Sequence, residues 1–145
     1  MIAIGADHAG YDAKEMLKKY LESKSIEYKD FGTHSKDSCH YPIFAEKVAR
    51  SVAKHESEKG ILVCGSGIGV SIAANKVGGV RAALCYEPEL AEMARKHNDA
   101  NVICFGARFS DTKKMEEMID IFLKTDFEGG RHGERVKLID TMENK

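Results

Sequence analysis

Gly60-Ile61-Leu62-Val63-Cys64-Gly65-Ser66-Gly67-Ile68-Gly69-Val70-Ser71 is the stretch of the chain that decides the fold. It opens with an apolar run, Ile61 to Cys64, of the kind found in strands that are buried on both faces. Glycines then occupy three alternate positions, and a helix-compatible segment follows. A strand that leads through a glycine loop into a helix directs several backbone N–H groups at one point, where the helix dipole favours an anion. The stretch therefore predicts an anion-binding loop in an α/β fold.

The spacing of these glycines matches neither of the two common nucleotide-binding loops. The dinucleotide fingerprint G-x-G-x-x-G would need a glycine where Val70 stands, and the P-loop would need a lysine that does not follow here. Cys64 lies at the mouth of the loop instead. It can be a small apolar residue that closes a buried strand, as free cysteines often are, or an acid–base group beside a row of N–H donors.

The composition limits the class of protein. A chain of 145 residues fits a single domain, 1–145, with a substantial core. The net charge of −1, with acidic and basic residues interleaved, argues against nucleic acid or an anionic membrane as a partner. No apolar run approaches the length of a membrane span, and the first residues read as a strand and not as a signal peptide. The four cysteines form no C-x-x-C pair, which favours reduced thiols and a cytoplasmic location.

The rest of the chain alternates between strand and helix patterns. Strands are expected at 1–5, 26–31, 61–64, 80–85 and 101–106. Helical stripes or caps mark the segments 13–21, 41–53, 70 to the Gly78-Gly79 pair, 88–96, 111–122 and 131–142. Because each connection between strands contains a helix, the pattern predicts a Rossmann-like, doubly wound, five-stranded parallel sheet with helices on both faces and an extra C-terminal helix. The alternation within 26–31 places that strand at an edge.

Polar residues follow two of the expected strands. In doubly wound sheets, ligands bind beyond the carboxyl ends of the strands, where the strand order reverses. If the first and third strands flank that point, Asp7 and His8 face Cys64 across one crevice. As isolated residues, Asp7 and His8 would more often cap a helix than act in catalysis.

Other polar residues lie at helix ends. His97 stands where a helix ends, a position at which histidine commonly interacts with the helix dipole. Arg131 and Arg135 lie four apart after a Gly-Gly pair, which suits a phosphate dianion, although a solvated basic face is the usual explanation. No pair of His, Asp or Cys residues stands at the spacing of metal ligands, so a metal site is not expected.

Taken together, these motifs resemble the ribose-5-phosphate isomerase B family, which is related to the lactose-pathway galactose-6-phosphate isomerases. The matching segments appear in order and cover nearly the whole chain: 5–10 (GADHAG), 37–42 with Tyr41-Pro42, 64–76 (CGSGIGVSIAANK), 79–82 (GVRA), 95–101 (RKHNDAN), 105–108 (FGAR) and 128–135 (EGGRHGER). In combination these motifs are far more specific than any single glycine loop.

The resemblance implies an aldose–ketose isomerase of the pentose phosphate pathway that interconverts ribose 5-phosphate and ribulose 5-phosphate through an enediolate, without a metal or cofactor. It implies that Cys64 is the base that moves a proton between C1 and C2, and that His97 is the acid that opens the sugar ring. Asp7 would support them, and Ser66 would shuttle a hydroxyl proton. Some relatives lack the cysteine and place a carboxylate where Val70 stands, so this chain falls in the cysteine-base group.

The substrate-binding residues are likewise implied by the resemblance. Backbone N–H groups of the loop would hold the enediolate oxygens, arginines and a histidine would bind the phosphate, and an amide and a phenol would contact the sugar. The loop donors are Gly65, Ser66, Gly67, Ile68 and Gly69. The phosphate-binding residues are Arg108, Arg131, Arg135 and His8. The residues in contact with the sugar are Asn98 and Tyr41, with Asp7 nearby.

Family members form homodimers or dimers of dimers in which each site borrows residues from the partner chain. Two alternatives to ribose 5-phosphate isomerisation stay open. One is a six-carbon substrate, allose 6-phosphate or galactose 6-phosphate. The other is a non-catalytic subunit that only binds a sugar phosphate, although such a binder would have no need of both Cys64 and His97.

Overall fold

A computed structural model describes residues 1–142 of the chain. These residues form a parallel sheet of five strands in the order β2-β1-β3-β5-β4. The strands are β1 (Ile2–Ala6), β2 (Tyr28–Asp30), β3 (Lys59–Cys64), β4 (Ala82–Leu84) and β5 (Val102–Gly106). The helices are α1 (Tyr11–Ser23), α2 (Tyr41–Ala53), α3 (Ile68–Asn75), α4 (Pro88–Lys96), α5 (Thr112–Lys124) and α6 (Arg131–Asp140), with a short 3-10 turn at His8–Gly10.

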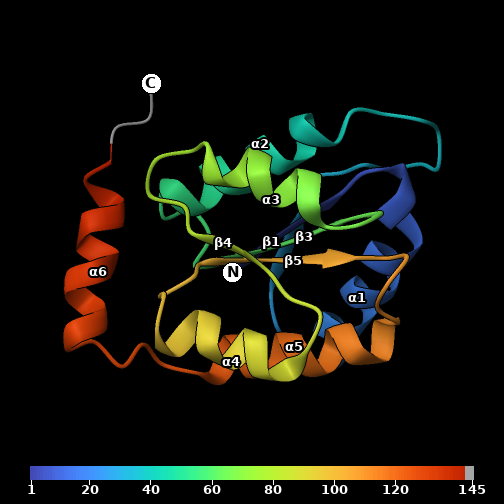
Figure 1. The fold of residues 1–145 in the computed structure, drawn as a ribbon. Coiled ribbons are helices and arrows are strands. Elements are labelled where there is room, and N and C mark those ends of the chain that lie inside the picture. Colours follow the sequence, from blue (N-terminus) through green and yellow to red (C-terminus); the bar gives the residue numbers. More distant parts are fainter. Residues whose placement is uncertain (143–145) are drawn as a thin grey trace.

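The helices cover both faces of the sheet. Helices α2 and α3 pack on one face, and α1, α4 and α5 pack on the other (Figure 1). Neighbouring residues of the central strands alternate between two cores, so that Ile61 and Val63 face α1 and α5 while Leu62 and Cys64 face α2 and α3. A strand covered on both faces reads as a continuous apolar run, which is why the 61–64 segment was recognisable as β3.

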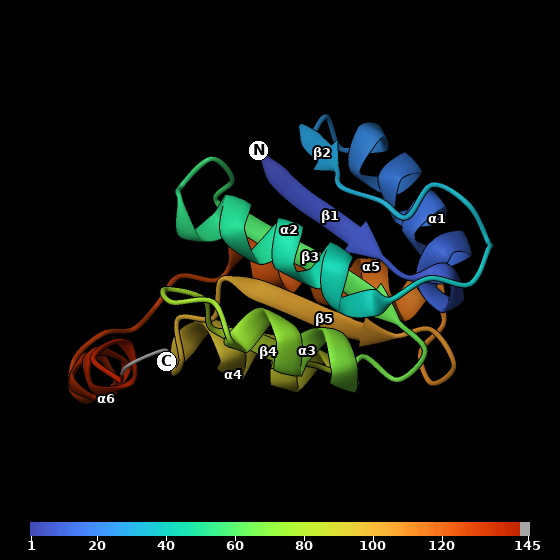
Figure 2. The ribbon, with the colours of Figure 1, turned by 90° about the horizontal axis from the view of Figure 1, so that it is seen from above.

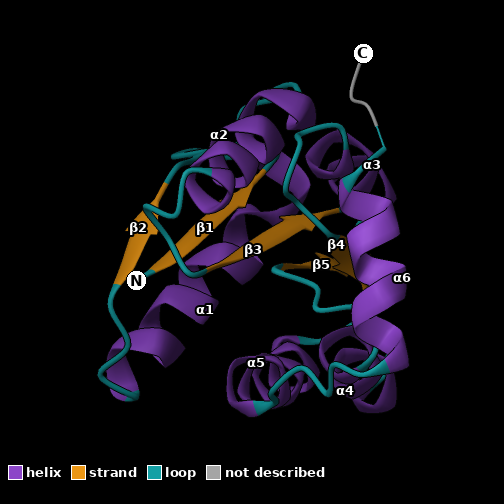
Figure 3. Cartoon of the chain, turned by 90° about the vertical axis from the view of Figure 1, so that its left-hand side faces the viewer, coloured by secondary structure: helices purple, strands orange, loops and turns teal. Residues whose placement is uncertain are grey.

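Helix α6 stands apart from these layers. It lies off the amino ends of β4 and β5, beside the ends of α3 and α4, and stands apart from the body of the molecule (Figures 2 and 3). Val136 is its buried residue, while the apolar side chains of Leu138 and Ile139 are exposed. An ion pair of 2.9 Å between Arg81 Nη1 and Asp140 Oδ1 ties its last turn to the sheet. The helix therefore contributes little to the core of a single chain.

The predicted fold class is confirmed, including the edge position of β2, the helix on each crossover and the C-terminal helix. Within residues 1–142, no helix combines the length and the apolar character that crossing a membrane requires.

The predicted element ends differ in two places near β4. Helix α3 ends at Asn75 and not at Gly78-Gly79, because the Asn75 side-chain amide bonds both the N–H and the C=O of Ala82. Strand β4 starts at Ala82 and not at Val80, because the Arg81 N–H donates to the side chain of Asn101 instead of to a neighbouring strand.

Candidate active site

Cys64 ends β3 with its side chain buried against the glycine loop. Its Sγ accepts a hydrogen bond of 3.1 Å from the backbone N–H of Gly67, so the thiol lies against one of the loop amides. Gly67 has a φ of +81°, and a Cβ there would lie 2.5 Å from Leu84 Cδ1 and 2.8 Å from the Phe105 carbonyl carbon. Only glycine can make this turn without strain, so the sequence of the loop fixes the donor that meets the sulfur.

The loop leads directly into α3. Gly67 occupies the N-cap position and supplies no side chain, and the Ser66 Oγ accepts a hydrogen bond of 3.1 Å from the N–H of Ile68. The first turn of α3 carries the positive end of the helix dipole next to the thiol. Both features favour an anionic ligand at the loop.

The end of β1 lies beside this loop, as the sequence predicts. The Asp7 N–H donates to the carbonyl of Val63 at 3.2 Å, and β1 and β3 are the neighbours at which the strand order reverses. The buried Asp7 carboxylate accepts from the Gly10 N–H at 3.1 Å, so the helix-cap interpretation of this residue is correct. The cap also fixes the carboxylate near the crevice.

His8 is held in one orientation by the loop before α2. Its Nδ1 accepts a hydrogen bond of 3.2 Å from the N–H of Cys39. A neutral imidazole whose Nδ1 accepts must carry its proton on Nε2. His8 can therefore offer an N–H donor to an anion.

Two long side chains flank the glycines. The ring of Tyr41 lies so close to Gly69 that a Cβ there would be 2.5 Å from the Tyr41 ring carbon Cε1. The guanidinium of Arg108 lies over Gly65, 3.3 Å from where a Cβ would stand. We call the set of residues at this edge of the sheet the glycine-loop half-site; it comprises Asp7, His8, Tyr41, Cys64, Gly65, Ser66, Gly67, Ile68, Gly69 and Arg108.

The structure adds Tyr86, which the sequence interpretation missed. Its hydroxyl donates a hydrogen bond of 2.6 Å to the carbonyl oxygen of Ser66, and its ring packs edge-on against Phe109 at 5.9 Å between centroids. The sequence did carry a signal, because Tyr86 closely follows β4 at the carboxyl edge of the sheet, as Asp7 follows β1.

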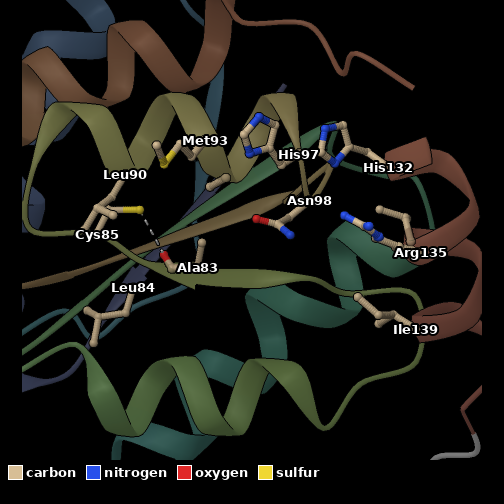
Figure 4. A pocket seen from close by; sticks show the side chains of 12 residues that line it. Ala83, Leu84, Cys85, Leu90, Met93, His97, Asn98, His132, Arg135 and Ile139 are labelled. Carbon is tan, nitrogen blue, oxygen red and sulfur yellow. Dashed lines mark hydrogen bonds between the residues drawn. The ribbon is translucent and has the colours of Figure 1, made fainter. Parts of the chain in front are cut away.

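The remaining predicted residues gather elsewhere. His97 ends α4, and its ring stacks on that of His132 with 4.3 Å between centroids and an angle of 14° between planes. Figure 4 shows the two rings side by side at the rim of a pocket of about 500 Å³, with Asn98 and Arg135 beside them. We call this group, together with Glu128 and Arg131, the histidine half-site.

Electrostatics distinguish the titratable groups near these half-sites. The pKa of His132 is lowered from its ordinary value, chiefly because the ring is partly withdrawn from water, and also because His97 and Arg131 are close. Burial raises the pKa of the Cys85 thiol to about 11 and that of Cys104 well above its usual range. Those two cysteines are therefore protonated at neutral pH, and both belong to the core.

The two half-sites lie at opposite ends of the strands. The glycine-loop half-site is at the carboxyl ends, and the histidine half-site is near the amino ends. Strand β5 begins at Val102, shortly after Asn98, and ends at Gly106, which pairs with Cys64. Its five residues span about 13 Å in the direction that separates the half-sites. One copy of the chain therefore does not bring Cys64 and His97 together.

The histidine half-site also brings together three possible metal ligands that do not stand at ligand spacing in the sequence. His97, Glu128 and His132 each offer a ligand atom, and these atoms all lie within 4.8 Å of one another. The sequence did not reveal this grouping because His97 comes from a different segment than the other two.

The sequence and the structure of this chain are similar to those of known sugar-phosphate isomerases. The model of the Ribose/Galactose Isomerase family matches residues 2–139. The chain is 42% identical to ribose-5-phosphate isomerase B of Escherichia coli K12 over 99% of its length and 97% of that protein. The solved ribose 5-phosphate isomerase B of Thermotoga maritima superposes with a TM-score of 0.95 at 46% identity, covering 97% of each chain. The type B enzyme of Trypanosoma brucei gives a TM-score of 0.94 at 48% identity, over 98% of this chain and 97% of that one.

Proposed function

This chain belongs to the ribose/galactose isomerase family, and on that premise we propose that it is a ribose-5-phosphate isomerase that interconverts ribose 5-phosphate and ribulose 5-phosphate. The observation that carries the proposal is the hydrogen bond from the Gly67 N–H to the Cys64 sulfur. It places a candidate base and a main-chain donor at the same point.

The reaction needs that combination. Removing the C2 proton of the open-chain aldose leaves negative charge on the carbonyl oxygen, so the site must present donors where the charge develops. Loss of one such donor typically costs about 10²–10³ in rate, and a general base contributes about 10²–10⁴. In the proposed mechanism, Cys64 takes the proton from C2 and returns it to C1, while N–H groups of Gly65 to Gly69 hold the enediolate. Ser66 moves the hydroxyl proton, and Asp7 supports the base.

Sugar phosphates occur largely as closed rings, so the enzyme must first open the ring. We assign this step to His97 as a general acid, with Asn98 and Tyr41 in contact with the sugar. Arg108 and His8 from the glycine-loop half-site would meet Arg131 and Arg135 on the phosphate. Phosphate held by guanidinium groups anchors the substrate away from the reacting carbons, which supplies binding energy for orientation.

Because a single chain separates the half-sites, the complete site requires two copies. The proposed assembly is a homodimer, alone or paired into a dimer of dimers, in which the histidine half-site of one copy meets the glycine-loop half-site of the other. Exposed apolar side chains on the helices near both half-sites support this assembly. They are Ile68 and Ile72 on α3, Leu90 and Met93 on α4, and Leu138 and Ile139 on α6.

The test of the function is isomerisation of ribose 5-phosphate in deuterium oxide. A cysteine-base isomerase produces ribulose 5-phosphate and incorporates solvent deuterium at C2 of the recovered aldose. A non-catalytic sugar-phosphate binder gives neither product nor exchange, and that result would refute the proposal.

A six-carbon substrate is the second candidate, because the description of the matching family includes galactose isomerases. Comparing kcat/KM for ribose 5-phosphate, allose 6-phosphate and galactose 6-phosphate separates the candidates. We expect ribose 5-phosphate to be preferred. The free cysteines at 39, 64, 85 and 104 support the proposed cytoplasmic location.

A further inference from the structure

We propose that His97, Glu128 and His132 form a binding site for a divalent cation of the zinc class, and that a cation bound there inhibits the enzyme. The three side chains come from the end of α4, the connection to α6 and the first turn of α6. Glu128 Oε1 lies 3.9 Å from His97 Nε2 and 3.8 Å from His132 Nε2. Within residues 1–142, these two imidazoles are the basic side chains found within 4.0 Å of this carboxylate.

The distances suit a metal with modest rearrangement. Zinc binds imidazole nitrogen and carboxylate oxygen at about 2.0–2.2 Å, so ligand atoms around a tetrahedral ion stand roughly 3.4 Å apart. The two nitrogen–oxygen distances exceed that value by less than an ångström, and the side chains of His97 and Glu128 are partly exposed. Three protein ligands would leave the fourth position open to water, as in zinc sites that exchange a ligand.

The backbone already holds the ligands in place without a metal. The Glu128 N–H donates to the Lys96 carbonyl at 3.1 Å, and the His97 N–H donates to the Met93 carbonyl at 2.9 Å. The Lys96 amine pairs with Glu92 at 2.6 Å. Preorganised ligands lose little conformational entropy when they bind an ion.

The ligand set also selects the class of cation. Two imidazoles and one carboxylate suit zinc, cobalt, nickel or copper, whereas magnesium and calcium prefer oxygen ligands only. Arg131 and Arg135 lie in the same half-site and oppose any cation, which argues for a site that is filled at elevated metal concentration and not for a permanent cofactor.

The inhibitory effect rests on the proposed function. A metal coordinated by His97 Nε2 removes the nitrogen that would donate the proton for ring opening. It would also place positive charge and a bound water where the sugar must enter. Zinc is therefore expected to compete with ribose 5-phosphate.

The site itself is tested without catalysis, by titrating metal-free protein with Co²⁺ and following its visible absorption. We expect one Co²⁺ per chain, with ligand-field bands of a nitrogen and oxygen site and no sulfur-to-cobalt charge-transfer band. Glu128→Gln should weaken binding at least about tenfold, the lower end of what loss of a merely supporting partner costs. The matched control is Glu134→Gln, which removes an exposed carboxylate in the first turn of α6 outside the cluster and should bind Co²⁺ as the unmodified chain does.

Three results would overturn the site: no Co²⁺ bound, a charge-transfer band that assigns a cysteine ligand, or equal affinity in Glu128→Gln and the control. His132→Gln repeats the test from the other ligand, and a circular dichroism spectrum of each variant shows that it is folded. The inhibitory role is measured separately, as the Zn²⁺ concentration that halves isomerase activity. A chain that binds Co²⁺ but whose activity is insensitive to Zn²⁺ would refute inhibition, while a chain without isomerase activity would refute the proposed function and leave the metal site standing.

Discussion

Cys64 differs from the other two buried cysteines, Cys85 and Cys104, in the group that its sulfur contacts. Cys85 and Cys104 lie in the cores, where burial raises the pKa of each thiol. Cys64 is equally buried, but its sulfur accepts the N–H of Gly67 at the start of a helix. This contact places the sulfur of Cys64, and not those of the other two, against the glycine loop.

Replacing Cys64 should therefore remove the chemistry and leave binding. We expect Cys64→Ala to lower kcat by about 10²–10⁴ while the affinity for a sugar phosphate stays within a few-fold. Steady-state kinetics together with calorimetric binding of a substrate analogue measure the two quantities. Cys85→Ala is the control and should keep its kcat; near-normal turnover in Cys64→Ala would show that another group is the base.

Tyr86 is a positioning residue and not a catalytic one, because it touches the loop and not the reacting atoms. Tyr86→Phe removes the donor to the Ser66 carbonyl but keeps the ring that packs against Phe109. We expect a loss of about 1 kcal/mol in the free energy of unfolding. We also expect a fall of roughly tenfold in kcat at nearly constant KM, because a displacement of the loop amides by a fraction of an ångström weakens the transition state more than the bound substrate. An unchanged kcat would mean that the loop keeps its shape without this hydrogen bond.

At the scale of the elements, the turn from β3 into α3 requires glycine at position 67. An alanine there would adopt a left-handed backbone and press its Cβ against Leu84 and Phe105. Gly67→Ala should lower the free energy of unfolding by about 3 kcal/mol or more, as the sum of strain and overpacking. Gly79 has a φ of +85° with open space around it, so Gly79→Ala carries the strain alone and should cost about 1 kcal/mol. Chemical denaturation compares them, and equal losses would show that the contacts of Gly67 do not matter.

Helix α6 carries two arginines, Arg131 and Arg135, and makes few packing contacts with the rest of its own chain. Because Arg131 and Arg135 are exposed and we assign them to the phosphate, replacing either with alanine should raise KM for ribose 5-phosphate by at least tenfold with a smaller change in kcat. Lys137→Ala, also on α6 and exposed, is the control. Unchanged KM values in both arginine variants would exclude the phosphate role.

Helices and strands were predictable from the sequence where their burial produces a recognisable pattern of apolar residues along the chain. The central strands β1, β3 and β5 are buried on both faces, so their apolar runs identified them. The ends of α3 and β4 were not predictable, because they depend on Asn75 and Asn101, whose side chains bond backbone groups distant in sequence. Asp111 was recognised as a cap because its partner, the Lys114 N–H, lies within the same helix.

At the scale of the whole molecule, the sequence could place one half of the site but not the other. Asp7 follows β1 and Cys64 ends the neighbouring strand β3, so the rule for parallel sheets places them at the same end of the sheet. His97 ends a helix that runs back to the amino ends of the strands. In the proposed dimer, it approaches Cys64 of the other copy, and no pattern along one chain encodes that contact. The cluster of His97, Glu128 and His132 likewise forms only when α6 folds back beside α4.

The most direct test of the account is complementation between two inactive variants. Chains carrying Cys64→Ala are mixed in equal amounts with chains carrying His97→Asn, then unfolded and refolded together. If each site joins Cys64 of one copy to His97 of the other, half of the dimers are mixed and each mixed dimer regains one intact site, so the mixture should recover about a quarter of the unmodified activity. A mixture as inactive as either variant alone, although mixed dimers are shown to form, would contradict the shared site.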